Sequence, residues 1–167
     1  MSYVALLRGI NLGKINKVDM QSLRSLFAQM GFPNVRTHIQ TGNVLFDEIV
    51  CDEQQLEARL KQTYGFDIPV TYRSKEELEN VANHPLFPQD RVYVVFLKNP
   101  LSAGQRERLN AVVNDEFAVV DPKTVIIRLS QNFHQTKYNN AFFENQLNML
   151  STLRNRNTVE QILRKMR

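Results

Sequence analysis

The chain has 167 residues and a net charge of +4, with 43% hydrophobic and 23% charged residues. This composition is typical of a globular protein with a buried core, and no run approaches the ~18 apolar residues that a membrane helix needs. The single cysteine, Cys51, excludes an intramolecular disulfide and any zinc site with two cysteine ligands. The N-terminal residues lack the pattern of a signal peptide, so the sequence predicts a cytoplasmic protein.

The positive charge is concentrated in the last 17 residues, where five bases accompany one acid. The remaining 150 residues carry equal numbers of bases and acids. A neutral body with a basic end does not favour nucleic acid as the partner. Two interpretations of the basic end stay open: cations that suit the C-terminal dipole of a helix, or a surface that binds phosphate.

The first half of the chain predicts strand, helix, strand, strand, helix, strand, which is the split βαβ, or ferredoxin-like, order. The strands are expected at 3–7, 35–40, 44–46 and 68–72 from apolar runs, and Gly42-Asn43 suits a tight turn between the middle two. Apolar residues with helical spacing and capping residues predict the two helices, with Asp19 and Asp52 as N-caps and Gln55 completing a capping box.

The second half repeats this order less regularly. Tyr93–Lys98 (YVVFLK) resembles Tyr3–Arg8 (YVALLR), and both predict a buried strand. Helices are expected from Ser74, from Ser102, over 141–150 and from Asn157, and strands near 117–120 and 124–129. The fold class predicted is α+β, with two ferredoxin-like units in tandem, antiparallel sheets and helices on one face. The units are expected at 1–83 and 91–167, with the C-terminal helix packing back, or as one intimately packed domain.

No residues form a recognisable catalytic set. The three histidines, His38, His84 and His134, lie far apart and show no metal-ligand spacing, so neither a metal nor a cofactor is predicted. Cys51 precedes a helix start, where the dipole could lower its pKa, but a lone cysteine is more often a small apolar filler.

The segment that follows the first strand is long and polar. Arg8 ends the strand, Gly9 allows the chain to turn, and the following residues through Val18 include Asn11, Lys14, Asn16 and Lys17. Backbone N–H groups, amides and cations in such a turn can bind an anion. The alternative is structural, because Asn and Gly also build turns and Arg8 could cap backbone carbonyl groups.

Three motifs, ALLRGIN-L-G…NKV (5–18), IQTGNVLF (39–46) and RNRNTV (154–159), resemble the bacterial domain-of-unknown-function 1697 family. The resemblance implies a two-part ferredoxin-like fold and no particular activity. Lys14 and Arg156 depart from the family pattern, which has Gly and Trp there. The residues that match its motif positions are Arg8, Gly9, Asn11, Asn16, Lys17, Gly42, Asn43, Arg154, Asn155, Asn157 and Thr158.

In a split βαβ unit the first and third strands are antiparallel neighbours, which places Gly9–Asn11 beside Thr41–Asn43. The RNRNT motif would join them if the last helix docks at the same end. The best prediction is a small cytoplasmic protein that binds an anionic or phosphorylated ligand. Its alternatives are an enzyme acting on a phosphorylated substrate, or motifs that are purely structural, with a role in interaction or oligomerisation. The predicted ligand-binding residues are Arg8, Gly9, Asn11, Asn16, Lys17, Gly42, Asn43, Arg154 and Asn155.

Overall fold

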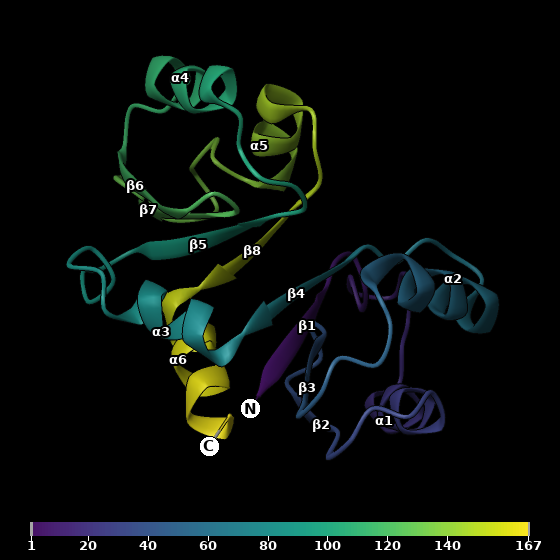
Figure 1. Cartoon of the computed structure of the whole chain (residues 1–167). Coiled ribbons are helices and arrows are strands. Elements are labelled where there is room, and N and C mark those ends of the chain that lie inside the picture. The colour runs from purple at the N-terminus through teal and green to yellow at the C-terminus, as the bar shows by residue number, and fades with distance from the viewer. Residues whose placement is uncertain (1, 167) are drawn as a thin grey trace. The chain divides into compact units, whose positions relative to one another are not determined.

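The structure is a computed structural model that describes residues 2–166. It contains two compact units (Figure 1). The first unit comprises the residues up to Glu77 and those from Gln161 onwards, and the second unit comprises Leu78–Glu160. The final segment of the chain is therefore part of the first unit. No helix among the described residues is long and apolar enough to cross a membrane.

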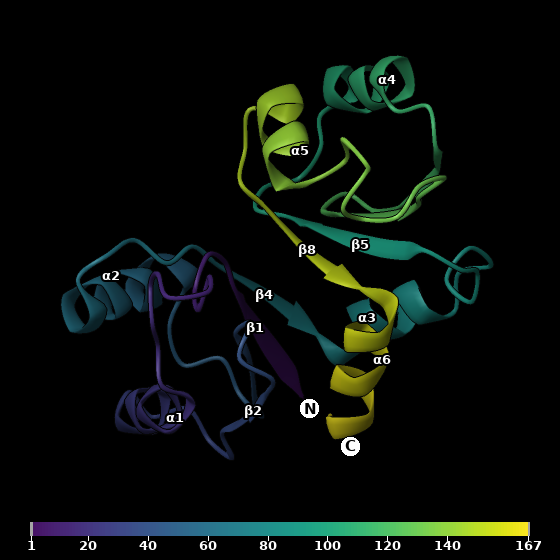
Figure 2. The ribbon, with the colours of Figure 1, turned by 180° about the vertical axis from the view of Figure 1, so that it is seen from behind.

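The first unit has the predicted strand and helix order. Its sheet is antiparallel with the order β2-β3-β1-β4, and α1 and α2 cover one face of it (Figures 1 and 2). This is the ferredoxin-like topology that the sequence predicts. The elements are β1 (Tyr3–Leu7), α1 (Met20–Gln29), β2 (Arg36–His38), β3 (Asn43–Phe46), α2 (Glu53–Tyr64) and β4 (Val70–Ser74), followed by α3 (Lys75–Ala82).

Local sequence explains where these helices begin. The carboxylate of Asp19 accepts from the backbone N–H of Ser22, and Asp52 and Gln55 form the predicted capping box of α2. The buried residues of the two helices pack on the sheet in one apolar cluster with Ala5, Val44 and Phe46. Burial of this helix face, rather than helix propensity, holds the elements together.

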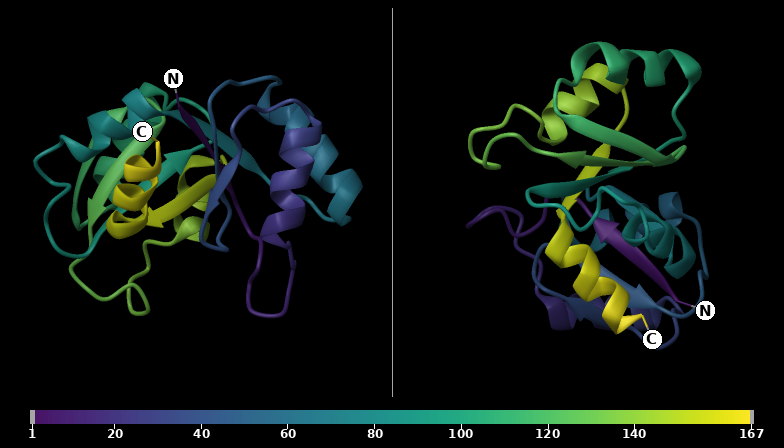
Figure 3. Two further views of the ribbon diagram at one scale, coloured as in Figure 1. Left: turned by 90° about the horizontal axis from the view of Figure 1, so that it is seen from below. Right: turned by 90° about the vertical axis from the view of Figure 1, so that its left-hand side faces the viewer.

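The second unit repeats this topology. Its sheet has the order β6-β7-β5-β8, and α4 and α5 cover one face (Figures 1 and 3). Residues of β5, α4, β7 and α5 form its core. The elements are β5 (Val92–Leu97), α4 (Ala103–Val112), β6 (Glu116–Asp121), β7 (Thr124–Arg128), α5 (Asn140–Leu147), β8 (Ser151–Asn155) and α6 (Arg156–Lys165).

Strand register shows how closely the two halves correspond. Val4 of β1 pairs with Leu45 and with Arg73, and Val94 of β5 pairs with Ile126 and with Arg154. Leu6 and Val94 are both fully buried in equivalent central strands. The structure confirms the tandem arrangement.

Strand β8 was not predicted, although it is the fourth strand of the second sheet. Helix α5 ends at Leu147, three residues earlier than predicted, because Asn148 adopts a left-handed conformation and accommodates the turn (φ 52°). The residues that follow this turn then pair with β5, from Ser151 to Asn155.

Two further predictions were wrong at the level of single residues. Asn157 does not cap the last helix, since α6 begins at Arg156 and the side chain of Asn155 accepts from the N–H of Thr158 (2.8 Å). Asn43 is not in the turn, because it pairs with Leu6 as the first residue of β3 and is fully buried.

Candidate functional site

The loop between β1 and α1, residues 9–18, is fixed by the side chain of Asn11. Its amide nitrogen donates to the carbonyl oxygens of Val18 (3.0 Å) and Gln40 (2.8 Å), and its oxygen accepts from the N–H of Val18 (2.8 Å). One asparagine therefore closes the base of the loop and joins it to the β2–β3 connection. Its left-handed backbone (φ 52°) is a conformation that Asn tolerates better than most residues.

The tip of this loop is a small hairpin. Leu12 and Ile15 exchange both backbone hydrogen bonds (3.0 and 2.9 Å), with Gly13-Lys14 as the turn. Asn16 supports it by donating from its amide nitrogen to the carbonyl oxygen of Gly9 (3.0 Å). The hairpin is thus an ordered projection rather than an unstructured connection.

The β2–β3 connection approaches the loop closely at Gly42. The N–H of Leu7 donates to the carbonyl oxygen of Gly42 (2.8 Å). A Cβ at Gly42 would lie 2.8 Å from Cβ of Leu7 and 2.9 Å from Cδ1 of Ile10. Next to it, the amide nitrogen of Asn43 donates to the carbonyl oxygen of His38 (2.9 Å) and to Oγ1 of Thr41 (3.1 Å).

The structure brings seven of the nine predicted ligand-binding residues together at this end of the first unit. We call it the loop rim and define it as residues 8–18 and 39–43. The amides of Asn11, Asn16 and Asn43 bond to the protein itself, which agrees with the structural interpretation of these three residues. The exposed cations of the loop rim are Lys14 and Lys17, and Arg8 is half-buried at its base.

The other two predicted residues, Arg154 and Asn155, belong to the second unit. Burial lowers the pKa of Arg154 to about 10, and its Nη1 donates to the carbonyl oxygen of Leu153 (3.1 Å). Asn155 caps α6. Its side-chain oxygen is therefore engaged with the helix N-terminus.

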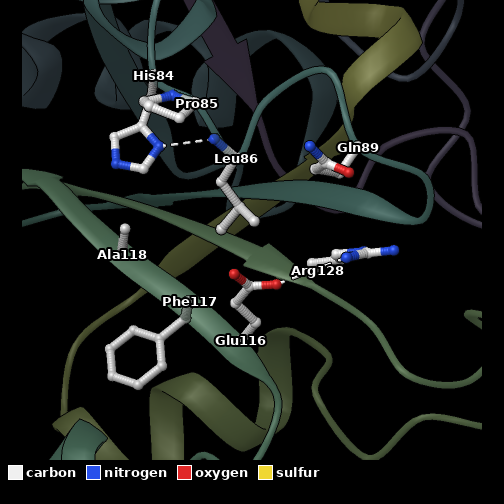
Figure 4. A pocket seen from close by; sticks show the side chains of 8 residues that line it. All are labelled: His84, Pro85, Leu86, Gln89, Glu116, Phe117, Ala118 and Arg128. Atoms are coloured by element: carbon white, nitrogen blue, oxygen red, sulfur yellow. Dashed lines mark hydrogen bonds and ion pairs between the residues drawn. The ribbon is translucent and has the colours of Figure 1, made fainter.

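Sequence reasoning missed a cavity in the second unit. It has a volume of about 380 Å³ and lies between the segment that follows α3 and the strands β6 and β7 (Figure 4). The two prolines of this segment predict only a linker, because nothing in the local sequence shows that the segment folds over a strand. The lining residues are His84, Pro85, Leu86, Gln89, Glu116, Phe117, Ala118 and Arg128.

Within residues 2–166 there is no group of three or more His, Cys, Asp or Glu side chains that could hold a metal ion. Burial raises the pKa of the Cys51 thiol. This result disagrees with the interpretation in which the dipole at the start of α2 lowers that pKa.

Fold and register define a protein of two tandem ferredoxin-like units. Residues 1–126 match the family described as "Protein of unknown function (DUF1697)", and the chain belongs to this family. No curated protein matches the chain. Among solved structures, the conserved bacterial protein SP0830 from Streptococcus pneumoniae is similar, with a TM-score of 0.73 and 24% identity over 99% of this chain and 97% of that protein. This likeness shows the shared fold.

Proposed function

We propose that this protein binds an anionic, phosphate-bearing ligand at the loop rim of the first unit, with Arg8, Lys14 and Lys17 as the cations. The observation that carries the proposal is the ordered projection of exposed lysines. Hydrogen bonds of Asn11 and Asn16 to carbonyl oxygens of the protein itself fix the loop. Binding therefore costs little additional ordering of the chain, which favours affinity.

The apolar side chains of the projection refine the ligand class. Leu12 and Ile15 are 57% and 65% exposed, directly beside the lysines. A ligand with both a phosphate and an apolar or planar portion, such as a nucleotide, would contact both kinds of side chain. A loop that only connects β1 to α1 would need neither the length of residues 9–18 nor these exposed side chains. We place this binding protein in the bacterial cytoplasm.

Thermal melts with and without millimolar phosphate or nucleotide test the proposal. A ligand that binds the folded state raises its melting temperature. We expect Lys17→Ala and Arg8→Ala to weaken binding tenfold or more, since each charge-assisted contact contributes about 1.5–3 kcal/mol. Arg59→Ala, which removes an exposed cation from α2 of the same unit, is the matched control and should leave binding unchanged.

The structural interpretation predicts that no anion raises the melting temperature of the native protein. Asn11→Gly does not separate the two interpretations, because Gly tolerates the positive φ and the loss of three side-chain hydrogen bonds lowers the melting temperature under either of them. If the native melt is insensitive to every anion tested, the binding proposal fails and the hydrogen-bonded loop remains a purely structural device.

A further inference from the structure

Strand β6 is the edge of the second sheet. Among residues 2–166 it pairs only with β7, and pairing is regular from Glu116 to Val119 before a register shift. An edge strand carries outward N–H and C=O groups that an added strand can bind. The extended backbone of a peptide is the ligand that satisfies such a row of groups.

The cavity lies directly beside this edge, on the face of the sheet opposite α4 and α5. Phe117 and Val119 join the core under those helices, so Glu116 and Ala118 point to the other face, where the cavity is. In Figure 4 the Phe117 ring points away from the cavity, and Leu86 points toward the sheet. A strand added to β6 would direct every second side chain to the face of the sheet on which this cavity lies.

The lining of the cavity indicates which side chain it would take. Its apolar wall consists of Pro85, Leu86 and Ala118. The guanidinium of Arg128 is paired with Asp90 (2.8 Å) and Glu116 (3.6 Å), and Arg91 also pairs with Asp90 (3.0 Å), so two cations compensate two carboxylates there. The cavity therefore suits an uncharged apolar side chain rather than an ion, and its volume of about 380 Å³ has room for an aromatic ring.

The charges of β6 indicate which peptide residues would flank the apolar side chain that enters the cavity. Glu116 and Asp121 stand at its two ends, and β6 contains no cation. Opposite charges on paired strands are stabilising, whereas like charges directly opposite each other are destabilising. In a centred antiparallel pairing of two copies of this chain, Glu116 of one copy would face Asp121 of the other. Charge therefore favours a basic partner over a second copy.

We propose that β6 binds an extended peptide segment of a partner protein as an additional strand. One apolar side chain of the peptide enters the cavity, and basic residues flank that side chain. This site lies within the second unit and does not depend on the anion site of the loop rim.

Titration of the ¹⁵N-labelled full chain with a blocked peptide tests the proposal. The probe is acetyl-Lys-Thr-Val-Leu-Thr-Val-Lys-amide, at low salt and up to millimolar concentration. We expect amide shifts at residues 116–119 and 84–89. Ala118→Phe should weaken binding at least tenfold, because the ring fills the cavity, while Ala111→Phe on the exposed face of α4 is the matched control and should not change it.

Two modified probes separate strand addition from other modes of binding. N-methylation of alternate peptide amides should abolish binding if backbone hydrogen bonds carry it, and replacing both lysines by glutamate should weaken it several-fold. The proposal is overturned if the unmodified peptide shifts none of these amides. It is also overturned if the N-methylated peptide binds equally well, or if sedimentation shows that β6 instead pairs two copies of the chain.

Discussion

Gly42 lies where the β2–β3 connection closely approaches the first strand. Its backbone has φ +98°, and a Cβ would lie 2.8 Å from that of Leu7. We expect Gly42→Ala to lower the free energy of unfolding by about 2–4 kcal/mol, from backbone strain together with overpacking against buried Leu7 and Ile10. Urea denaturation of the native protein and the variant measures this loss.

Gly31 is a matched control for this substitution. It has the same φ of +98°, yet nothing lies within 4 Å of a Cβ at that position. Gly31→Ala should therefore cost only the backbone term, about 1–2 kcal/mol. Equal losses for the two variants would show that the close contact at Gly42 is relieved by small shifts and contributes nothing.

His38 makes the stability of the first unit depend on pH. Partial burial lowers the pKa of His38, and the positive charge of Lys165 lowers it further. Its buried Nδ1 has no hydrogen-bond partner among the described residues. The folded protein thus resists protonation at a pH where the unfolded chain, with a pKa of about 6.5, accepts the proton. This contribution to stability is present above pH 6.5 and is lost as the pH falls from there through the lowered pKa.

The comparison of native protein with His38→Gln between pH 7.5 and pH 5 isolates this effect. We expect the melting temperature of the native protein to fall more steeply below pH 6.5 than that of the variant, because only the native protein has an imidazole at position 38 that takes up a proton on unfolding. Parallel curves for the two proteins would contradict the assignment to His38.

At the scale of elements, the side chain of Asn155 caps the start of α6. Asn155 accepts from the N–H of Thr158 at the start of the helix. Asn155→Ala should reduce the free energy of unfolding by about 0.5–2 kcal/mol, the usual cost of losing such a cap. Chemical denaturation followed by circular dichroism measures it.

Asn157 provides the control, since the sequence pattern predicts that residue as the cap. It is exposed and lies in the first turn of α6. Asn157→Ala should be neutral or slightly stabilising, because Ala is the better helix former. The reverse result, a large loss at Asn157 and none at Asn155, would contradict the observed helix start.

The elements that the sequence predicts correctly are those whose own residues specify them. Continuous apolar runs specify β1 and β5, and capping boxes specify the starts of α2, α3 and α4. Strand β8 has no such signal, because its sequence STLRN is short and polar and its partner β5 lies far away in the chain. Alignment with the register of β4 would have revealed it, since Arg154 occupies the position of Arg73.

The sequence predicts that the RGIN and TGN motifs lie side by side, but it does not predict what their amides bond to. Antiparallel pairing of β1 with β3 brings the RGIN and TGN motifs together, and that pairing follows from the topology. The use of each amide does not follow from the sequence. Asn11 bonds to Gln40, 29 residues away, and only the folded backbone shows that such an asparagine serves the loop rather than a ligand.

At the scale of the whole molecule, the final segment of the chain stabilises the first unit. Met166 is buried, its carbonyl oxygen accepts from Oγ of Ser2 (2.9 Å), and the carbonyl oxygen of Lys165 accepts from Arg36 (3.1 Å). We expect Met166→Ala to cost about 2–5 kcal/mol. Amide hydrogen exchange should show the loss of protection mainly in β1, β2 and β3.

Leu109→Ala is the counterpart of this variant in the second unit. Leu109 is fully buried in the core beneath α4. Truncation of this side chain should reduce amide protection against hydrogen exchange mainly in β5, β6 and β7. If both variants reduce protection equally throughout residues 2–166, then the two compact units unfold as one cooperative body.

The hydrogen bond between Ser2 and Met166 spans 164 positions of the chain, and this has a consequence for synthesis on the ribosome. The strands of the first unit emerge first, but the unit is complete only when residues 161–166 have been translated. Translation adds about 5–20 residues per second, so the intervening second unit takes roughly 4–17 seconds to make. During that interval the nascent first unit must persist without its last segment. The half of the protein that is made first is therefore the last to reach its native state.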